Sequence, residues 1–145
     1  MNTDTSTAPQ DCIFDKIITR EIPATVVYED EYTLAFLDIS PVSLGHTLVI
    51  PKKHVTNIFD VNQETLNHVL ETVRKIAPAV RDSVGAHGVH INSNHAAEAG
   101  QVVFHLHFHI IPRHDRTDYE FWPKIDVTPK QAEETAQKIR ELILN

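Results

Sequence analysis

Several short apolar stretches of the chain, bounded by polar or turn-forming residues, predict β-strands. The first four such runs are 24–30, 33–39, 46–51 and 89–92. A fifth, 104–111 (FHLHFHII), alternates apolar side chains with His105, His107 and His109. Because alternate side chains of a strand point to opposite faces, one face should be dry and the other should line one groove with three histidines. Pro112 should end this strand, since proline cannot donate a ladder hydrogen bond.

Three other segments have the three-to-four-residue spacing of amphipathic helices. A short helix is predicted over 12–18 and a long one over 60–81, with Asp60 and Gln63 as its capping box. Pro78 should kink or divide the long helix because proline removes a backbone hydrogen bond. Thr128 and Pro129 predict the start of a last helix, whose apolar positions are Ala132, Ala136, Ile139 and Ile143. The sequence therefore predicts an α+β domain, an antiparallel five-stranded sheet with flanking helices.

Size and composition limit the function classes. A chain of 145 residues suits a single domain, here 12–145, after a flexible N-terminal tail at 1–11 that lacks the features of a secretory signal. The chain has no apolar run of the roughly 20 residues that cross a bilayer. One cysteine, Cys12, fits a reducing compartment and predicts a cytoplasmic protein. The formal charge of −7 argues against binding nucleic acid, and no membrane partner is expected.

The three alternating histidines admit three interpretations. Buried imidazoles with hydrogen-bond partners would make them ordinary core residues. Two or three of them could bind a catalytic zinc ion, although rings spaced along one strand converge poorly on one ion. The third interpretation is proton or phosphate chemistry, which suits imidazoles that titrate near neutral pH. We favour the third, because aligned histidines stabilise a sheet poorly.

The histidine run and the IIPR after it resemble the signature of the histidine triad (HIT) superfamily, His-φ-His-φ-His-φ-φ with φ apolar. Other segments resemble that family in the same order along the chain: CIFDKII at 12–18, EIPA at 21–24, YEDE at 28–31, LAFLDI at 34–39, GHTLVIPKKH at 45–54 and AGQ at 99–101. The resemblance is strongest to the small branch of histidine triad nucleotide-binding proteins. It implies a homodimeric hydrolase that cleaves purine nucleoside phosphoramidates, or related nucleotidyl conjugates, at the α-phosphate.

The resemblance also implies a role for each histidine. His107 would be the nucleophile and form a covalent nucleotidyl-histidine intermediate, which water then hydrolyses. His109 would donate a hydrogen bond to a phosphate oxygen, while His105 and His46 would fix tautomers and relay protons. His107 must then present a lone pair to phosphorus while its other ring nitrogen donates elsewhere. No metal or other cofactor is needed in this scheme.

Nucleotide contacts are implied in the same way. Asp38 would accept hydrogen bonds from the ribose hydroxyls. The expected base pocket comprises Phe14, Ile17, Phe36, Leu37 and Ile39, and the expected ribose and phosphate contacts are Asn94, Gly100, Gln101 and Val102. At Gly100 the lack of a side chain would let the backbone approach the ligand closely.

The chain departs from the family pattern at two positions. Ala96 occupies a place where glycine is common, so the loop before AGQ should be stiffer. Many bacterial relatives carry C-x-x-C at the amino end as part of a structural zinc site, but Asp15 replaces the second cysteine here. Cys12 and His54 are left as possible ligands, and we expect no bound zinc because a thiolate is lost.

Two other functions stay open at the level of sequence. One is hydrolysis of dinucleoside polyphosphates, as in another branch of the superfamily. The other is a nucleotide-binding scaffold whose partners matter more than turnover.

Overall fold

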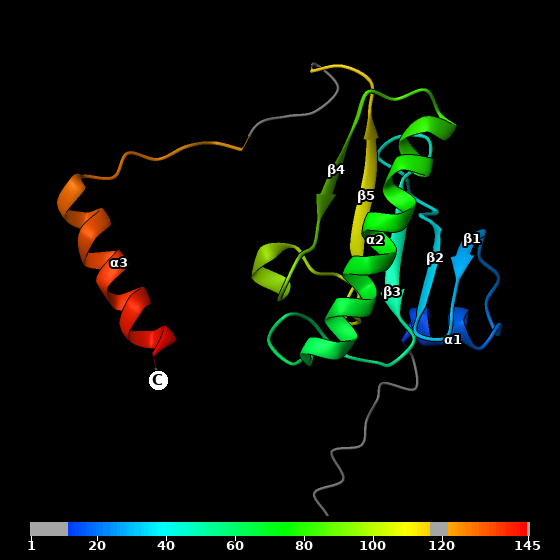
Figure 1. The fold of residues 1–145 in the computed structure, drawn as a ribbon, viewed down its shortest axis with the longest axis horizontal. Helices are drawn as coiled ribbons and strands as arrows, with labels where there is room; N and C mark the ends of the chain where they lie inside the picture. Colours follow the sequence, from blue (N-terminus) through cyan, green and yellow to red (C-terminus); the bar gives the residue numbers. More distant parts are fainter. Residues whose placement is uncertain (1–11, 117–121, 145) are drawn as a thin grey trace, which may run out of the picture.

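The computed structural model describes residues 12–116 and 122–144. Its centre is one antiparallel sheet with the strand order β1-β2-β3-β5-β4 (Figure 1). The strands are β1 (Val26–Glu29), β2 (Thr33–Leu37), β3 (Thr47–Pro51), β4 (Gly88–Asn92) and β5 (Phe108–Arg113). The helices are α1 (Ile13–Ile18), α2 (Gln63–Ser83), the short 3₁₀ helix η1 (Ala97–Ala99) and α3 (Pro129–Ile143). The α+β prediction with five antiparallel strands is confirmed, and the predicted tail at 1–11 lies outside the described residues.

The sheet separates two apolar layers. On one face, Leu34 and Phe36 of β2 pack with Leu48 and Ile50 of β3 and with the buried side chains of α1. On the other face, α2 lies across the sheet, and Ala35 of β2 belongs to its layer (Figure 1). Both faces of the central strands are therefore dry, which agrees with the nearly continuous apolar sequences of β2 (TLAFL) and β3 (TLVIP).

Strand β5 is shorter at its start and longer at its end than the sequence predicts. It begins at Phe108, because its pairing with β3 begins at Val49 and the chain before it bonds a loop instead, through Leu106 N–H to Val55 O at 2.7 Å. Pro112 does not end the strand. Pro112 pairs with Val89 of β4 on one side of β5. On the other side, the pairing of β5 with β3 ends at Ile110, so no ladder hydrogen bond there requires an N–H from Pro112.

Helix α2 differs from the prediction at its cap and at its proline. Asn62, not Asp60, is the N-cap, and its side chain accepts a 2.8 Å hydrogen bond from Thr65 N–H. Asp60 instead accepts hydrogen bonds from the backbone of the preceding turn. The helix is not divided at Pro78, because buried residues before and after it, Val73 and Val80, pack on the sheet.

Helix α3 begins as the sequence predicts. The Thr128 side chain accepts from Gln131 N–H, the Gln131 side chain accepts in return, and Pro129 occupies the first turn. The helix stands apart from the rest of the molecule on the side of β4 (Figure 1). None of the helices in the described ranges combines the length and apolar character that a bilayer span requires.

Candidate active site

A cleft of about 450 Å³ opens on the α1 face of the sheet. Its apolar wall comes mainly from α1, β2 and β3, and includes Phe14, Ile17, Phe36 and Leu48. Its polar atoms belong to side chains from loops and strand ends: Asp38, Ser40, Asn94, His107 and His109. A mostly apolar cleft with a few convergent polar groups is the usual form of a small-molecule site.

His107 is held in one tautomer by the backbone beside it. Its Nδ1 lies 2.7 Å from the carbonyl oxygen of His105, which can only accept, so Nδ1 carries the proton and donates. The lone pair of His107 is therefore on Nε2. The ring is 8% exposed and lines the cleft, and the edge of Phe14 packs against it with 5.1 Å between ring centroids.

His109 is also held in one tautomer, but its Nδ1 accepts a hydrogen bond instead of donating one. The backbone N–H of Val42 donates to His46 Nδ1 at 3.1 Å, so the proton of His46 is on Nε2. That nitrogen lies 2.8 Å from His109 Nδ1 and donates to it. His109 therefore carries its own proton on Nε2 and can donate it to a ligand in the cleft.

Burial keeps these rings neutral. The pKa of His109 is lowered to about 4 by burial and then by its neighbours His107 and His46. Burial also lowers the pKa of His107 and that of His46. The Asp38 carboxylate, whose Oδ2 lies 3.6 Å from His46 Nε2, opposes the lowering at His46. At neutral pH the cleft therefore presents one imidazole lone pair and one imidazole N–H, which can attack and stabilise an electrophilic phosphorus respectively.

His105 does not line the cleft, contrary to the predicted groove of three histidines. Its side chain is 0% exposed, and its Nε2 donates to Pro51 O at 2.8 Å. Residues 103–107 are not strand, so the alternation expected from a straight strand does not apply there. The contribution of His105 to the site is its backbone carbonyl, which fixes His107.

The loop before the histidines is held by a buried amide. Gln101 is 4% exposed; its side chain donates to Thr56 O and Val103 O and accepts from Ala96 N–H and from Asn57. Gly100 has φ +92°, a conformation that favours glycine, and a Cβ there would meet the Asn94 amide at 3.5 Å. The loop thus brings Asn94, Gly100 and Val102 to the rim of the cleft.

Comparisons with known proteins agree with this geometry. The family model described as HIT domain matches residues 19–116, which is more than half of the chain. This chain belongs to the HIT domain family. "Protein hit" of Bacillus subtilis is 50% identical over 109 residues, which are 75% of each chain. Adenosine 5'-monophosphoramidase hnt1 of Schizosaccharomyces pombe is 35% identical over 135 residues, covering 91% of this chain and 98% of its own.

A solved structure extends the likeness over most of the chain. The crystal structure of a Streptococcus mutans protein, 39% identical, superposes with a TM-score of 0.87 and covers 96% of this chain and 89% of its own. The resemblance inferred from the sequence motifs is thereby confirmed.

Most residues that the HIT resemblance singles out come together around the cleft. They are Phe14, Ile17, Phe36, Asp38, Ile39, Asn94, Gly100, Val102, His107 and His109. His46 reaches the site through His109. Three residues lie elsewhere. His105 is fully buried, and the Gln101 side chain makes its hydrogen bonds inside the loop. Leu37 points to the α2 face because it is one residue from Phe36 in β2.

The sequence did not single out seven other residues that line the cleft, since nothing in their local sequence separates them from core or loop: Ile13, Ile22, Pro23, Ala24, Ser40, Leu48 and Val103. The backbone N–H of Val42, which orients His46, was missed for the same reason.

Behind the cleft, four side chains with metal-binding atoms converge. Cys12 Sγ lies 3.7 Å from His105 Nδ1, and Asp15 lies 3.4 Å from His105 Nδ1 and 2.8 Å from His54 Nδ1. All four ligand atoms lie within 4.8 Å of one another. A thiol, a carboxylate and two imidazoles are all zinc donors, so this set fits a zinc-like ion with Asp15 in place of the second cysteine. The expectation that no zinc binds stays a prediction.

Proposed function

We propose that this HIT protein is a nucleotidyl hydrolase that cleaves purine nucleoside phosphoramidates, or related nucleotidyl conjugates, at the α-phosphate. One observation carries the proposal: His107 is locked with its Nδ1–H on a carbonyl, so the lone pair of a neutral imidazole is on Nε2 in a nucleotide-sized cleft. The name of the S. pombe relative, a monophosphoramidase, supports this substrate class.

The reaction runs in two displacements. In the first, His107 Nε2 forms a bond to the α-phosphorus while the bond from phosphorus to the leaving nitrogen breaks, and that nitrogen takes a proton from solvent as it departs. In the second, water attacks phosphorus and gives up a proton to solvent, the bond to His107 breaks, and a nucleoside monophosphate and neutral His107 are released. Splitting one difficult displacement into two lowers the barrier that each must cross.

His109 stabilises the negative charge that builds up on the phosphate oxygens. Its Nε2–H is the donor, because His46 occupies its Nδ1. A donor fixed in advance in a water-poor site stabilises a developing charge without reorganisation. Asp38 and Asn94 are proposed to bind the ribose, and Phe14, Ile17, Phe36 and Ile39 to contact the base.

We expect His107→Ala to reduce hydrolysis of an adenosine phosphoramidate to background while nucleotide binding, followed by calorimetry, stays largely intact. The nucleophile is lost, but the apolar wall and Asp38 remain. His68→Ala, on α2 and outside the lining of the cleft, is the control. Quenching wild-type turnover in mild base should preserve a nucleotide on the peptide that contains His107. Unchanged turnover in the alanine variant would contradict the covalent mechanism.

Because the four-residue cluster behind the cleft fits zinc, its contribution needs a separate test. There Cys12, Asp15, His54 and His105 would hold the ion, and it would brace α1 against the histidine segment. We expect a chelator to leave the hydrolysis rate unchanged, since no step needs a metal. Loss of turnover with chelator and its return with zinc would instead favour a metal-dependent hydrolase.

Two alternatives are distinguished by substrate. A dinucleoside polyphosphate hydrolase would turn over a diadenosine polyphosphate faster than an adenosine phosphoramidate, and a scaffold would turn over neither. We further propose that the protein acts as a homodimer, as the family resemblance implies, and that it is cytoplasmic, as its single cysteine suggests.

A further inference from the structure

The backbone of His107 lies just beyond the paired part of its strand. Strand β5 begins at the next residue, Phe108, and the last pair that it forms with β4 joins His109 to Asn92. Along an antiparallel pair, the backbone groups that face one neighbour recur at every second residue, so the His107 carbonyl follows that of His109. Within the described strands the ladder ends before it reaches this carbonyl. The sheet alone therefore does not hold the backbone of the proposed nucleophile on this side.

Ser93, the residue after β4, supplies the donor that the ladder lacks there. Its Oγ donates a hydrogen bond of 2.7 Å to the His107 carbonyl. The ring of His107 is tied separately, because its Nδ1–H donates to the carbonyl of His105 at 2.7 Å. Since both the backbone and the ring are bonded, the direction in which Nε2 points is fixed by Ser93 together with His105.

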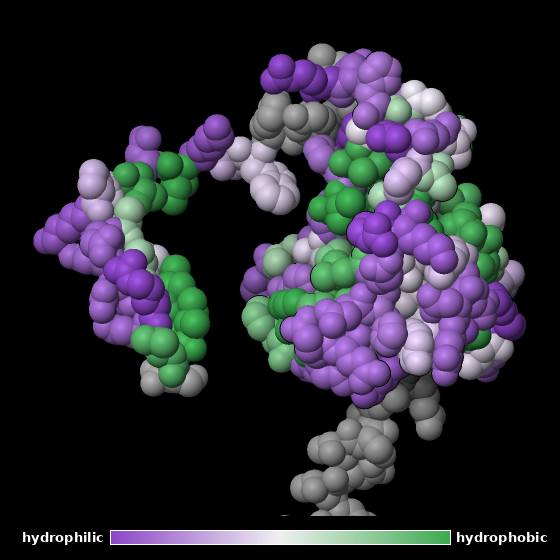
Figure 2. All heavy atoms as spheres, in the orientation of Figure 1, coloured by the Kyte–Doolittle hydropathy of each residue, from purple (hydrophilic) through white to green (hydrophobic). Residues whose placement is uncertain are grey.

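A second serine makes the same kind of bond in α2, on the other face of the sheet. Ser83 Oγ donates to the carbonyl of Val80 at 2.9 Å near the end of the helix, and both serine bonds are partly buried. The outer side of α2, largely hydrophilic, faces the viewer in Figure 2, whereas the cleft opens on the opposite face. The two hydroxyls should contribute similarly to stability, because each satisfies one backbone carbonyl. Only the acceptor of Ser93 belongs to a residue that lines the cleft.

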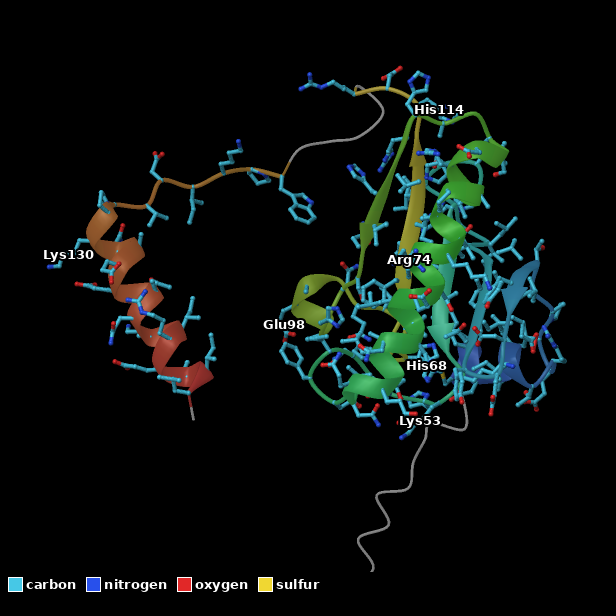
Figure 3. The ribbon with its side chains drawn as sticks, in the orientation of Figure 1. Lys53, His68, Arg74, Glu98, His114 and Lys130 are labelled. Carbon is cyan, nitrogen blue, oxygen red and sulfur yellow. The ribbon has the colours of Figure 1, made fainter. Side chains whose placement is uncertain are left out.

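The loop that carries Ser93 is itself held in place. It runs from the end of β4 past Glu98 (Figure 3). Between these points, His95 Nδ1 accepts a 2.9 Å hydrogen bond from the backbone N–H of Ile58, in the segment that joins β3 to α2. The His95 ring also packs edge-on against Phe108, with 6.5 Å between ring centroids. A hydroxyl on this loop can act as a fixed point, because the loop is bonded to a second segment of the fold.

We propose that Ser93 is a positioning residue for hydrolysis, whose hydroxyl holds His107 Nε2 on its line of attack through the His107 carbonyl. This inference rests on the function proposed above. Ser93 does not line the cleft and therefore acts through His107. Attack requires a close and aligned approach, and a misplacement of about 1 Å can cost roughly 100-fold in rate. The neighbouring Asn94 does line the cleft, so a loss of positioning must be separated from a loss of nucleotide binding.

Steady-state hydrolysis of an adenosine phosphoramidate by the full-length protein makes that separation. We expect Ser93→Ala to lower kcat by about tenfold and to leave KM within about twofold, because the ground-state contacts with the nucleotide remain. Ser83→Ala is the matched control and should leave both constants within about twofold of wild type. Equal kcat values for the two alanine variants, or a raised KM at an unchanged kcat, would overturn the positioning role.

A conservative variant identifies the hydroxyl as the responsible group. Ser93→Thr keeps the hydroxyl and should recover kcat to within about threefold of wild type. Threonine suits the backbone here, since Ser93 does not have a positive φ. A threonine variant that is folded by circular dichroism but as slow as Ser93→Ala would also contradict the proposal.

The ligand-free protein provides a readout that does not depend on turnover. In ¹H–¹⁵N spectra, the His107 Nδ1–H should give one sharp imidazole signal, assigned by its absence in His107→Gln. We expect this signal to persist in Ser83→Ala and to be lost to solvent exchange in Ser93→Ala, because the ring can then leave the His105 carbonyl. Persistence of the signal in Ser93→Ala would overturn the positioning role. If wild type showed the expected signals but no hydrolysis, the proposed function would fail while the hold of Ser93 on His107 stood.

Discussion

At the scale of single residues, backbone groups decide what each histidine can do. The carbonyl of His105 puts the lone pair of His107 on Nε2, while the N–H of Val42, acting through His46, puts a proton on Nε2 of His109. Two identical side chains thereby present opposite groups to the cleft, a lone pair and an N–H, which suit the proposed roles of nucleophile and hydrogen-bond donor. The HIT resemblance implied these roles, but the alternation of the two rings along the chain does not distinguish them.

His46 is a positioning residue in this account, and His46→Ala tests it. Without its Nε2–H, the His109 ring can turn or change tautomer, so its donor is no longer fixed. We expect kcat to fall by about 10- to 100-fold with little change in KM, by analogy with the loss of other orienting hydrogen bonds. Adding His46→Ala to a His109→Ala variant should cost little more. A change in KM alone would contradict the positioning role.

At the scale of elements, the loop from 93 to 103 combines a rigid anchor with local strain. Gln101 anchors it by bonding Thr56 O, Val103 O and Ala96 N–H from inside the fold. Ala96 has φ 82° and ψ 157°, in a region that is essentially reserved for glycine. Sequence comparison with the family pattern already marked Ala96 as unusual. The structure shows that the alanine backbone is strained at this position.

Ala96→Gly should therefore stabilise the protein. Relief of backbone strain of about 1–3 kcal/mol exceeds the entropic cost of glycine, so the free energy of unfolding should rise by about 1 kcal/mol. Urea denaturation followed by circular dichroism measures it. Ala97→Gly, in the adjacent 3₁₀ helix and without a positive φ, is the matched control and should destabilise. A loss of stability in both variants would show that the strain is absent.

At the scale of the whole molecule, the sheet puts its stabilising packing and its chemistry on opposite faces. The α2 layer is mainly apolar, with the buried hydroxyl pair of Thr33 and Thr72 inside it. The α1 layer continues into the cleft and surrounds imidazoles that burial keeps neutral. Keeping an imidazole uncharged inside the fold links global stability to pH.

His109 makes this linkage measurable. The unfolded imidazole binds a proton near pH 6.5, but the folded ring, facing His107, His46 and Asp38, binds one only at about 4. Between pH 6.5 and about 4, this residue therefore takes up a proton when the protein unfolds. The free energy of unfolding should consequently fall as the pH drops below 6.5. The slope from this residue approaches about 1.4 kcal/mol per pH unit. Thermal unfolding of His109→Gln should show a shallower acid slope than wild type; an equal slope would contradict the assignment.

The sequence by itself determined the class of fold and most of the site. The short apolar runs of β2 and β3, the helical spacing of α2 and the cap at Thr128 are local patterns, and local patterns report secondary structure. The histidine signature and its accompanying motifs identified the HIT family and ten residues that line the cleft.

Only the tertiary structure decided where those patterns stop. A period of two cannot show that β3 pairs with β5 only from Val49 to Thr47, so it could not show that His105 leaves the strand and the cleft. Nor could it show that Pro112 stays in β5 or that Leu37 turns toward α2. Strand ends, the faces that helices cover and the tautomers of buried rings all depend on groups distant in the chain, and local periodicity carries no information about them.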